Sequence, residues 1–155
     1  MRYANINEVD TVNGQGVAVS IFFQGCSHHC KGCFNVETWD FNGGYKFTDD
    51  VRDYFIKACQ KPYINCVSIL GGEPFDQPDF LLSILTDVHK HVNKPVYVWS
   101  GYLYEDLLIK YEHILKLIDY LIDGEFVENK KDLTLKLRGS SNQRIIDLKL
   151  KNSKR

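Results

Sequence analysis

The stretch VAVSIFFQGCSHHCKGC, residues 17–33, joins an apolar segment to a cluster of cysteines. Its first seven residues are rich in β-branched and aromatic side chains, which predicts a buried strand over residues 17–23. The loop that holds Cys26, Cys30 and Cys33 is therefore expected to leave the carboxyl end of that strand. Three of the chain's five cysteines lie within eight residues here, which favours a metal site in a reducing compartment over a disulfide framework.

The segments that follow alternate between helix and strand patterns. Helical spacing of apolar residues and short β-branched runs predict helices over residues 49–61, about 78–88 and 105–117, and strands over residues 65–70, 95–99 and 120–122. Residues 143–150 fit one further strand. Repeated strand–helix units predict an α/β fold with a mostly parallel sheet, whose ligands bind at the carboxyl ends of the strands.

Length and composition are those of one globular domain covering residues 1–155. Hydrophobic residues make up 44% of the chain and charged residues 25%, which excludes a disordered polypeptide. No apolar leader and no run of about 18 apolar residues is present, so we expect a cytoplasmic protein without a membrane partner. The net charge of −1 disfavours a nucleic-acid binder.

The charges are distributed unevenly along the chain. Residues 130–155 contain nine basic and two acidic residues, a net charge of +7, which leaves −8 on residues 1–129. The end of this stretch, about residues 149–155, forms a basic tail. Either it is a solvated basic end, or it belongs to a surface that docks an acidic partner or a phosphate.

The cysteine spacing is compatible with two kinds of metal site. A cluster of four irons needs four coordination positions, and Cys26, Cys30 and Cys33 fill three, which leaves one iron open for a small molecule. The alternative is zinc, held by the three cysteines together with His28 or His29. No second CxxC pair completes a zinc finger, and spacing alone leaves both alternatives open.

Two motifs together resemble the radical S-adenosylmethionine (SAM) superfamily. CSHHCKGC fits its CxxxCxxC signature, and GGEP at residues 71–74 resembles its glycine-rich SAM-binding turn. DTVNGQG at 10–16, CFNVETWDFNGG at 33–44 and RGSSNQRIID at 138–147 are similar to the anaerobic ribonucleotide reductase activating proteins. The resemblance spans nearly the whole chain.

The resemblance implies the fold, the cofactors and the reaction. The fold is an open partial (β/α) barrel of the radical SAM type, with about five to six mostly parallel strands. Cys26, Cys30 and Cys33 would ligate a [4Fe-4S] cluster whose fourth iron is chelated by SAM. An electron from the cluster would cleave a C–S bond of SAM, and the resulting 5′-deoxyadenosyl radical would take a hydrogen from a glycine Cα of the large reductase subunit. No side chain is expected to act as an acid or base, and an electron donor such as flavodoxin is implied.

Cofactor contacts are expected at the strand ends and beside the third cysteine. Gly71 and Gly72 lack side chains, which would let a strand end approach SAM closely. Many superfamily members carry an aromatic residue just before the third cysteine, whereas this chain has Gly32 there and Phe34 just after, so the backbone between them is expected against the adenine. The whole expected set is Gly32, Cys33, Phe34, Gly71, Gly72, Glu73, Ser100 and Asp123.

Several residues near the motifs have a structural reading beside the functional one. His28 and His29 are expected to be loop or docking residues rather than ligands, and Cys59 and Cys66 to be core thiols. Trp39 and Phe41 are either packing residues or a lid over the cluster. Residues 138–144 form either a flexible loop or a loop that belongs to the site or contacts a partner.

The leading hypothesis is therefore an activating enzyme of the anaerobic reductase. With only five or six strands the sheet cannot close into an eight-stranded barrel, so its mouth should admit a polypeptide loop. The alternatives are a short radical SAM enzyme that acts on a small molecule, similar to the deazaguanine synthases, and a zinc-stabilised binding module.

Overall fold

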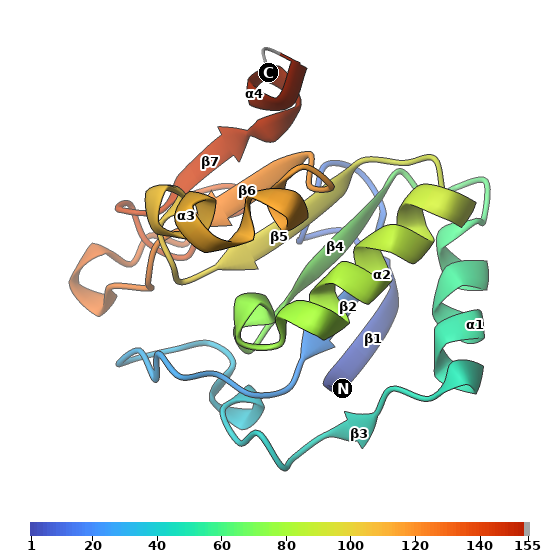
Figure 1. Ribbon diagram of the computed structural model, residues 1–155. Helices are drawn as coiled ribbons and strands as arrows, with labels where there is room; N and C mark the ends of the chain where they lie inside the picture. The colour runs from blue at the N-terminus through green and yellow to red at the C-terminus, as the bar shows by residue number, and fades with distance from the viewer. Residues whose placement is uncertain (154–155) are drawn as a thin grey trace.

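The computed structural model describes residues 1–153, and the described strands form one mixed seven-stranded sheet (Figure 1). The strand order is β3-β1-β2-β4-β5-β6-β7. The four central strands β2, β4, β5 and β6 are parallel, and β1, β3 and β7 are antiparallel to their neighbours. Their bounds are β1 Arg2–Asp10, β2 Ala18–Phe23, β3 Tyr45–Lys46, β4 Cys66–Gly71, β5 Val96–Ser100, β6 Tyr120–Asp123 and β7 Arg144–Asp147.

The three longer helices connect the central strands, as the alternating pattern predicts. In α1 the Thr48 hydroxyl accepts a hydrogen bond from the Val51 N–H, which caps the first turn. Pro78 starts α2 at a position where a missing N–H costs nothing. The helices are α1 Asp49–Cys59, α2 Pro78–His91, α3 Tyr104–Leu115 and α4 Leu148–Ser153, with short 3₁₀ turns η1 Val36–Thr38, η2 Pro74–Asp76 and η3 Glu128–Lys130.

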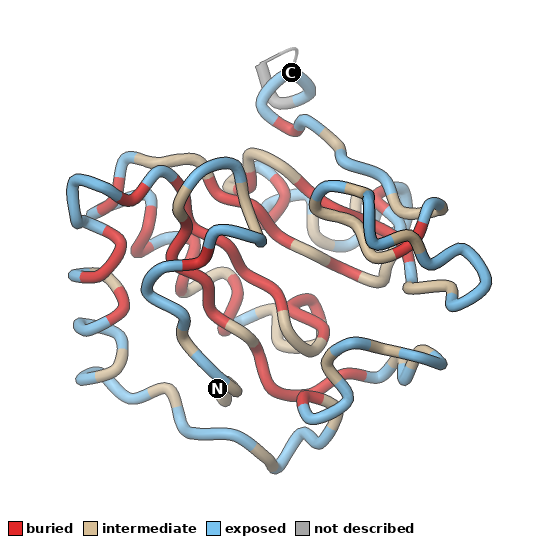
Figure 2. The backbone as a smooth tube through the Cα atoms, turned by 180° about the vertical axis from the view of Figure 1, so that it is seen from behind, coloured by how far each residue is buried: buried red, intermediate tan, exposed pale blue. Residues whose placement is uncertain are grey.

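The two faces of the sheet are covered differently. Alternate strand residues such as Val19, Ile69 and Val98 pack with α1, α2 and α3 into the main hydrophobic core. The opposite face carries a small second cluster, made of Ala18, Cys66, Tyr97 and Ile122. Figure 2 views this second face, where buried strands are seen without helices in front of them. Loops take the place of helices on this face.

The sheet has more antiparallel strands than the sequence predicts. β1 was not expected, because its residues RYANINEVD are mostly polar and only partly buried. The strand predicted over residues 143–150 is wrong in its second half, where α4 begins. Leu148 and Lys149 begin this helix, and both donate backbone hydrogen bonds to the carbonyl of Asp119. The count of seven strands therefore replaces the expected five to six.

The connections bring the functional motifs together at one end of the parallel strands. The carboxyl ends of the parallel strands β2, β4, β5 and β6 lie side by side, and the motifs follow these ends. β7 runs in the opposite direction, so α4 starts at the other end. The end of the predicted basic tail, residues 154–155, lies outside the described residues. In the part of the chain that is described, no helix is long and apolar enough to cross a membrane.

Candidate functional site

The cysteine loop leaves β2 through a turn held by the segment that follows the loop. The Gly25 N–H donates to the Thr38 carbonyl at 2.6 Å, and the Cys26 N–H donates to the Trp39 carbonyl at 3.2 Å. A Cβ atom on Gly25 would lie 2.2 Å from the Phe41 ring, so only glycine allows this ring to cover the turn. Phe41 is thus a packing residue of the loop.

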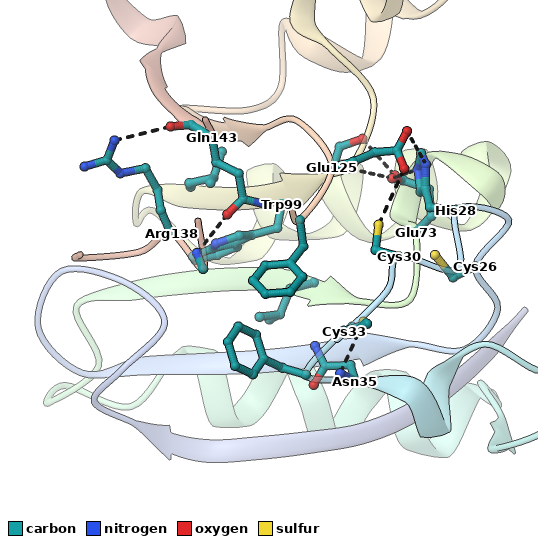
Figure 3. Close-up of a pocket in the computed structure, with 18 of the residues that line it drawn as sticks. Cys26, His28, Cys30, Cys33, Asn35, Glu73, Trp99, Glu125, Arg138 and Gln143 are labelled. Carbon is teal, nitrogen blue, oxygen red and sulfur yellow. Dashed lines mark hydrogen bonds and ion pairs between the residues drawn. The ribbon is translucent and has the colours of Figure 1, made fainter. Parts of the chain in front are cut away.

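The three clustered cysteines line one cavity of about 420 Å³ at the carboxyl edge of the sheet. Cys26 and Cys30 lie toward one side of it, and Trp99 and Arg138 lie toward the other (Figure 3). Of the expected contact residues, Cys33, Phe34, Gly71, Gly72, Glu73 and Ser100 line this cavity. The structure therefore brings both family motifs to one space.

Glu73 joins the cysteine loop to the ends of two strands. Its buried carboxylate accepts hydrogen bonds from His28 Nε2 at 2.7 Å, the Gly101 N–H at 2.7 Å and the Ser100 hydroxyl at 2.9 Å. A fourth bond comes from the Phe75 N–H at 3.0 Å. The bond to Glu73 raises the pKa of His28. This carboxylate holds the loop in place through His28.

The cysteine thiols of the cavity are partly buried. Burial raises the pKa of Cys26, and burial together with a hydrogen bond to Glu125 raises the pKa of Cys30 to about 11. The Cys30 Sγ lies 3.5 Å from the Glu125 carboxylate, and the Cys33 Sγ accepts the Asn35 N–H at 3.4 Å. Within residues 1–153, no three His, Cys, Asp or Glu side chains are grouped so as to hold a single metal ion.

The donor set on the cavity wall fits an iron–sulfur cluster with a bound small molecule. Three cysteine side chains face a space that continues past Gly71 and Ser100, and thiolates are the ligands that such clusters take. The imidazoles that the zinc alternative requires have other contacts. His28 bonds to Glu73, and the His29 ring stacks on Trp39 with centroids 4.5 Å apart.

Gly71 and Gly72 also have a packing reason to be glycine. A Cβ atom on Gly72 would lie 2.2 Å from the Gly25 carbonyl oxygen, and one on Gly71 would lie 2.6 Å from the Phe23 nitrogen. Gly71 also has a φ of +105°, which favours glycine. The missing side chains thus let the ends of β4 and β2 pack together, although both residues also line the cavity.

Gly32 and Asp123 are not among the residues that line this cavity. Gly32 packs against the Glu128 side chain. Asp123 is fully buried and accepts bonds from the Tyr104 N–H at 2.7 Å and from Arg144 Nε at 2.9 Å. Its neighbour Gly124 lines the cavity instead. Arg144 also pairs with Glu105 at 2.7 Å, so Asp123 anchors β7 to α3.

The remaining residues with two readings can also be assigned. Cys59 and Cys66 are buried in the two hydrophobic clusters, which confirms them as core thiols. Trp39 lines the cavity. Of the 138–144 loop, Arg138, Gly139 and Gln143 reach the same cavity, so the loop belongs to the site.

Several residues on the cavity wall across from the cysteines were not predicted from the sequence. Val12, Phe126, Leu133, Leu135 and Leu137 all line it. The leucines occur at every second position of an otherwise polar, basic stretch. That pattern is a signal that could have pointed to them.

Comparisons with known proteins agree with this site. Residues 12–146 match the family model described as a 4Fe-4S single cluster domain, which confirms the predicted cluster at the level of the family. The anaerobic ribonucleoside-triphosphate reductase-activating proteins of Salmonella typhi and Escherichia coli K12 are 38% and 36% identical to this chain. Both alignments cover 92% of this chain and 96% of the relative. The corresponding protein of Enterobacteria phage T4 is 38% identical, over 94% of this chain and 93% of its own length. The chain therefore belongs to the family of anaerobic ribonucleoside-triphosphate reductase-activating proteins.

Proposed function

We propose that this protein activates the large subunit of an anaerobic ribonucleotide reductase by generating a glycyl radical on it. The observation that carries the proposal is the shared cavity, in which Cys26, Cys30 and Cys33 face the ends of β4 and β5. The names of its relatives supply the target. An open cavity at the edge of an incomplete barrel is compatible with a substrate that is itself a polypeptide.

The three cysteines would hold the [4Fe-4S] cluster, and the strand ends would hold SAM. Gly71, Gly72 and Ser100 offer backbone at the cavity wall. When bound, the cluster and SAM supply an electron and a C–S bond whose cleavage gives methionine and a 5′-deoxyadenosyl radical, which takes a hydrogen from glycine.

The chain's own residues orient these groups and limit the access of water. Glu73 holds the cysteine loop through His28 and holds β5 through Ser100. Phe34 contributes an apolar ring to the cavity wall, packed on Phe126 with centroids 5.0 Å apart. The backbone at Gly32, next to Cys33, would lie against the adenine, and Asp123 holds Arg144 and the start of α3 beside the cavity. No side chain is required as an acid or base.

The wider setting follows from the same proposal. We propose that the sheet with its helix-free face is the open partial barrel that the resemblance predicts, formed by one domain over residues 1–155. An electron donor such as flavodoxin and a cytoplasmic location stay predictions.

Electron paramagnetic resonance tests the proposal directly. The reconstituted protein would be incubated without oxygen with SAM, dithionite and the large reductase subunit of the same organism. We expect a glycyl radical on the reductase, formed only when SAM is present, and no radical with Cys33→Ala. A protein that carries iron and cleaves SAM but leaves the reductase without a radical would contradict the proposal. A colourless protein with bound zinc would contradict it as well.

A further inference from the structure

Residues 131–140 form a closed loop on the cavity wall, which we name the leucine loop. Its ends are joined by a bridge between Lys131 and Ser140, and the Asp132 N–H donates to the Gly139 carbonyl at 3.2 Å. Trp99 Nε1 donates to the Leu137 carbonyl at 2.7 Å, which fastens the loop to the end of β5. The two ends of the leucine loop are therefore held in place, and its middle residues form a tip that extends beyond them.

The tip presents apolar side chains that the protein's own core does not cover. Leu133, Leu135 and Leu137 all line the main cavity, and Leu133 is 79% exposed. Two other loops contribute exposed apolar residues to the same cavity, namely Val12, which is 73% exposed, and Phe34, which is 51% exposed. Large apolar side chains gathered at one opening mark an interaction site.

The leucine loop connects this opening to the cysteine loop. Lys131 Nζ lies 5.2 Å from the centre of the Phe34 ring. A Cβ atom on Gly139 would lie 2.9 Å from the same ring. A molecule bound against Leu133 would thus lie within one cavity with the cysteines.

The charge of the leucine loop indicates what it binds. Its ten residues contain Lys131, Lys136 and Arg138 against the single acid Asp132, a net charge of +2. Basic side chains on both sides of exposed leucines complement a segment that has an apolar residue with carboxylates beside it.

We propose that the leucine loop is the docking site for an extended, apolar and acidic segment of the reductase polypeptide. The proposal rests on the proposed function, which supplies the partner, and adds the surface that selects it. Leu133 and Val12 contact the apolar side chain of the segment, and Lys136 faces its carboxylates. Docking here places the segment beside the cysteine loop.

Matched substitutions at the loop and on the opposite surface test the proposal. Leu133→Asp and Lys136→Glu are compared with Ile109→Asp on α3, where Ile109 is 86% exposed, and with Lys90→Glu in the last turn of α2. Binding to the purified reductase is measured by biolayer interferometry, and radical yield is measured against reductase concentration. Circular dichroism and iron content verify that each variant is folded and loaded.

We expect Leu133→Asp to raise both the dissociation constant and the half-saturating reductase concentration by about tenfold or more, as loss of an apolar anchor does. The radical yield at saturating reductase should return toward that of the parent, and Leu133→Met should restore binding. Lys136→Glu should weaken binding most at low salt. The Ile109 and Lys90 variants should bind as the parent does.

Three outcomes would overturn these proposals, and they can be told apart. If the parent forms the radical and both loop variants bind like the parent, the docking proposal is wrong while the function stands. If Leu133→Asp changes only self-association in sedimentation, the loop contacts a second copy of this chain, and the docking proposal is wrong. If the parent binds the reductase but forms no radical, the proposed function is wrong.

Discussion

The two groups of cysteines differ in what surrounds each sulfur atom. Cys26, Cys30 and Cys33 face the cavity, whereas Cys59 and Cys66 are buried among apolar side chains. Replacing any cavity cysteine by alanine should abolish the cluster absorption near 400 nm and the bound iron. Cys59→Ala should keep the cluster and lower the free energy of unfolding by about 1 kcal/mol.

Iron analysis and urea unfolding measure both effects for each variant. Cys66→Ala is the second core control and should behave like Cys59→Ala. Loss of iron from a folded Cys59 or Cys66 variant would show that the ligand assignment is wrong.

The absence of a Cβ atom at Gly72 allows the cysteine loop to lie close to the end of β4. In Gly72→Ala the new Cβ would meet the Gly25 carbonyl oxygen at 2.2 Å, so the loop would have to move. We expect the free energy of unfolding to fall by about 2 kcal/mol or more, together with incomplete iron loading.

Gly124→Ala is the comparison for this variant. Gly124 has a φ of +100° but its nearest neighbouring atom would lie 3.7 Å from a new Cβ, so only backbone strain of about 1 kcal/mol is expected. Urea unfolding and iron content distinguish the two glycines. Unchanged stability of Gly72→Ala with a reduced affinity for SAM would instead mean that the space is reserved for SAM.

At the level of elements, Arg144 fastens β7 to α3 and β6. It pairs with the buried Asp123 and with Glu105 in the first turn of α3. Arg144 lowers the pKa of Glu105 from 4.5 to about 2. Because the folded-state pKa is the lower one, the stabilisation is present above pH 4.5 and is lost as the pH falls from 4.5 toward 2.

Glu105→Gln should therefore lower the melting temperature at pH 6 and have little effect near pH 2. Melting temperatures of parent and variant, measured at each pH together with iron content, give the difference directly. Asp53→Asn, at an exposed position of α1, is the control for the removal of a surface carboxylate. A difference between parent and Glu105→Gln that stays constant over this pH range would contradict the role of the pair.

The elements also show which parts of the fold local sequence can predict. The strand over residues 17–23 and the start of α2 at Pro78 follow from side-chain type and from proline geometry, and the structure confirms both. β1 has a mostly polar sequence and becomes a strand through pairing with β2 and β3. That pairing depends on distant residues, as does the contact between Arg144 and Glu105, 39 positions apart.

For the molecule as a whole, the described part of the basic stretch that begins at residue 130 lies in two separate places. Lys131 and Lys136 belong to the leucine loop, whose leucines line the cavity, whereas α4 with Lys149 lies at the other end of the strands. The sequence predicts the excess charge but not this separation. A docking role for the described part of the tail is therefore less favoured than one for the leucine loop.

The uneven covering of the sheet gives a last prediction. The helices stabilise one face, whereas the cavity side depends on three loops, residues 11–17, 24–35 and 124–143, that meet around the site. A ligand that bridges these loops binds only the folded state and so stabilises it. At a SAM concentration 100 times its dissociation constant, the gain is about 2.7 kcal/mol. For a chain of 155 residues, this raises the melting temperature by about 5–10 °C.

Because the proposed site places SAM on the cluster, the shift should require bound iron and be absent in Cys33→Ala. Differential scanning fluorimetry under nitrogen measures the shift for the loaded protein, the iron-free protein and the variant. An equal shift in all three samples would mean that SAM binds away from the cysteines, and the shared cavity would then not be its site.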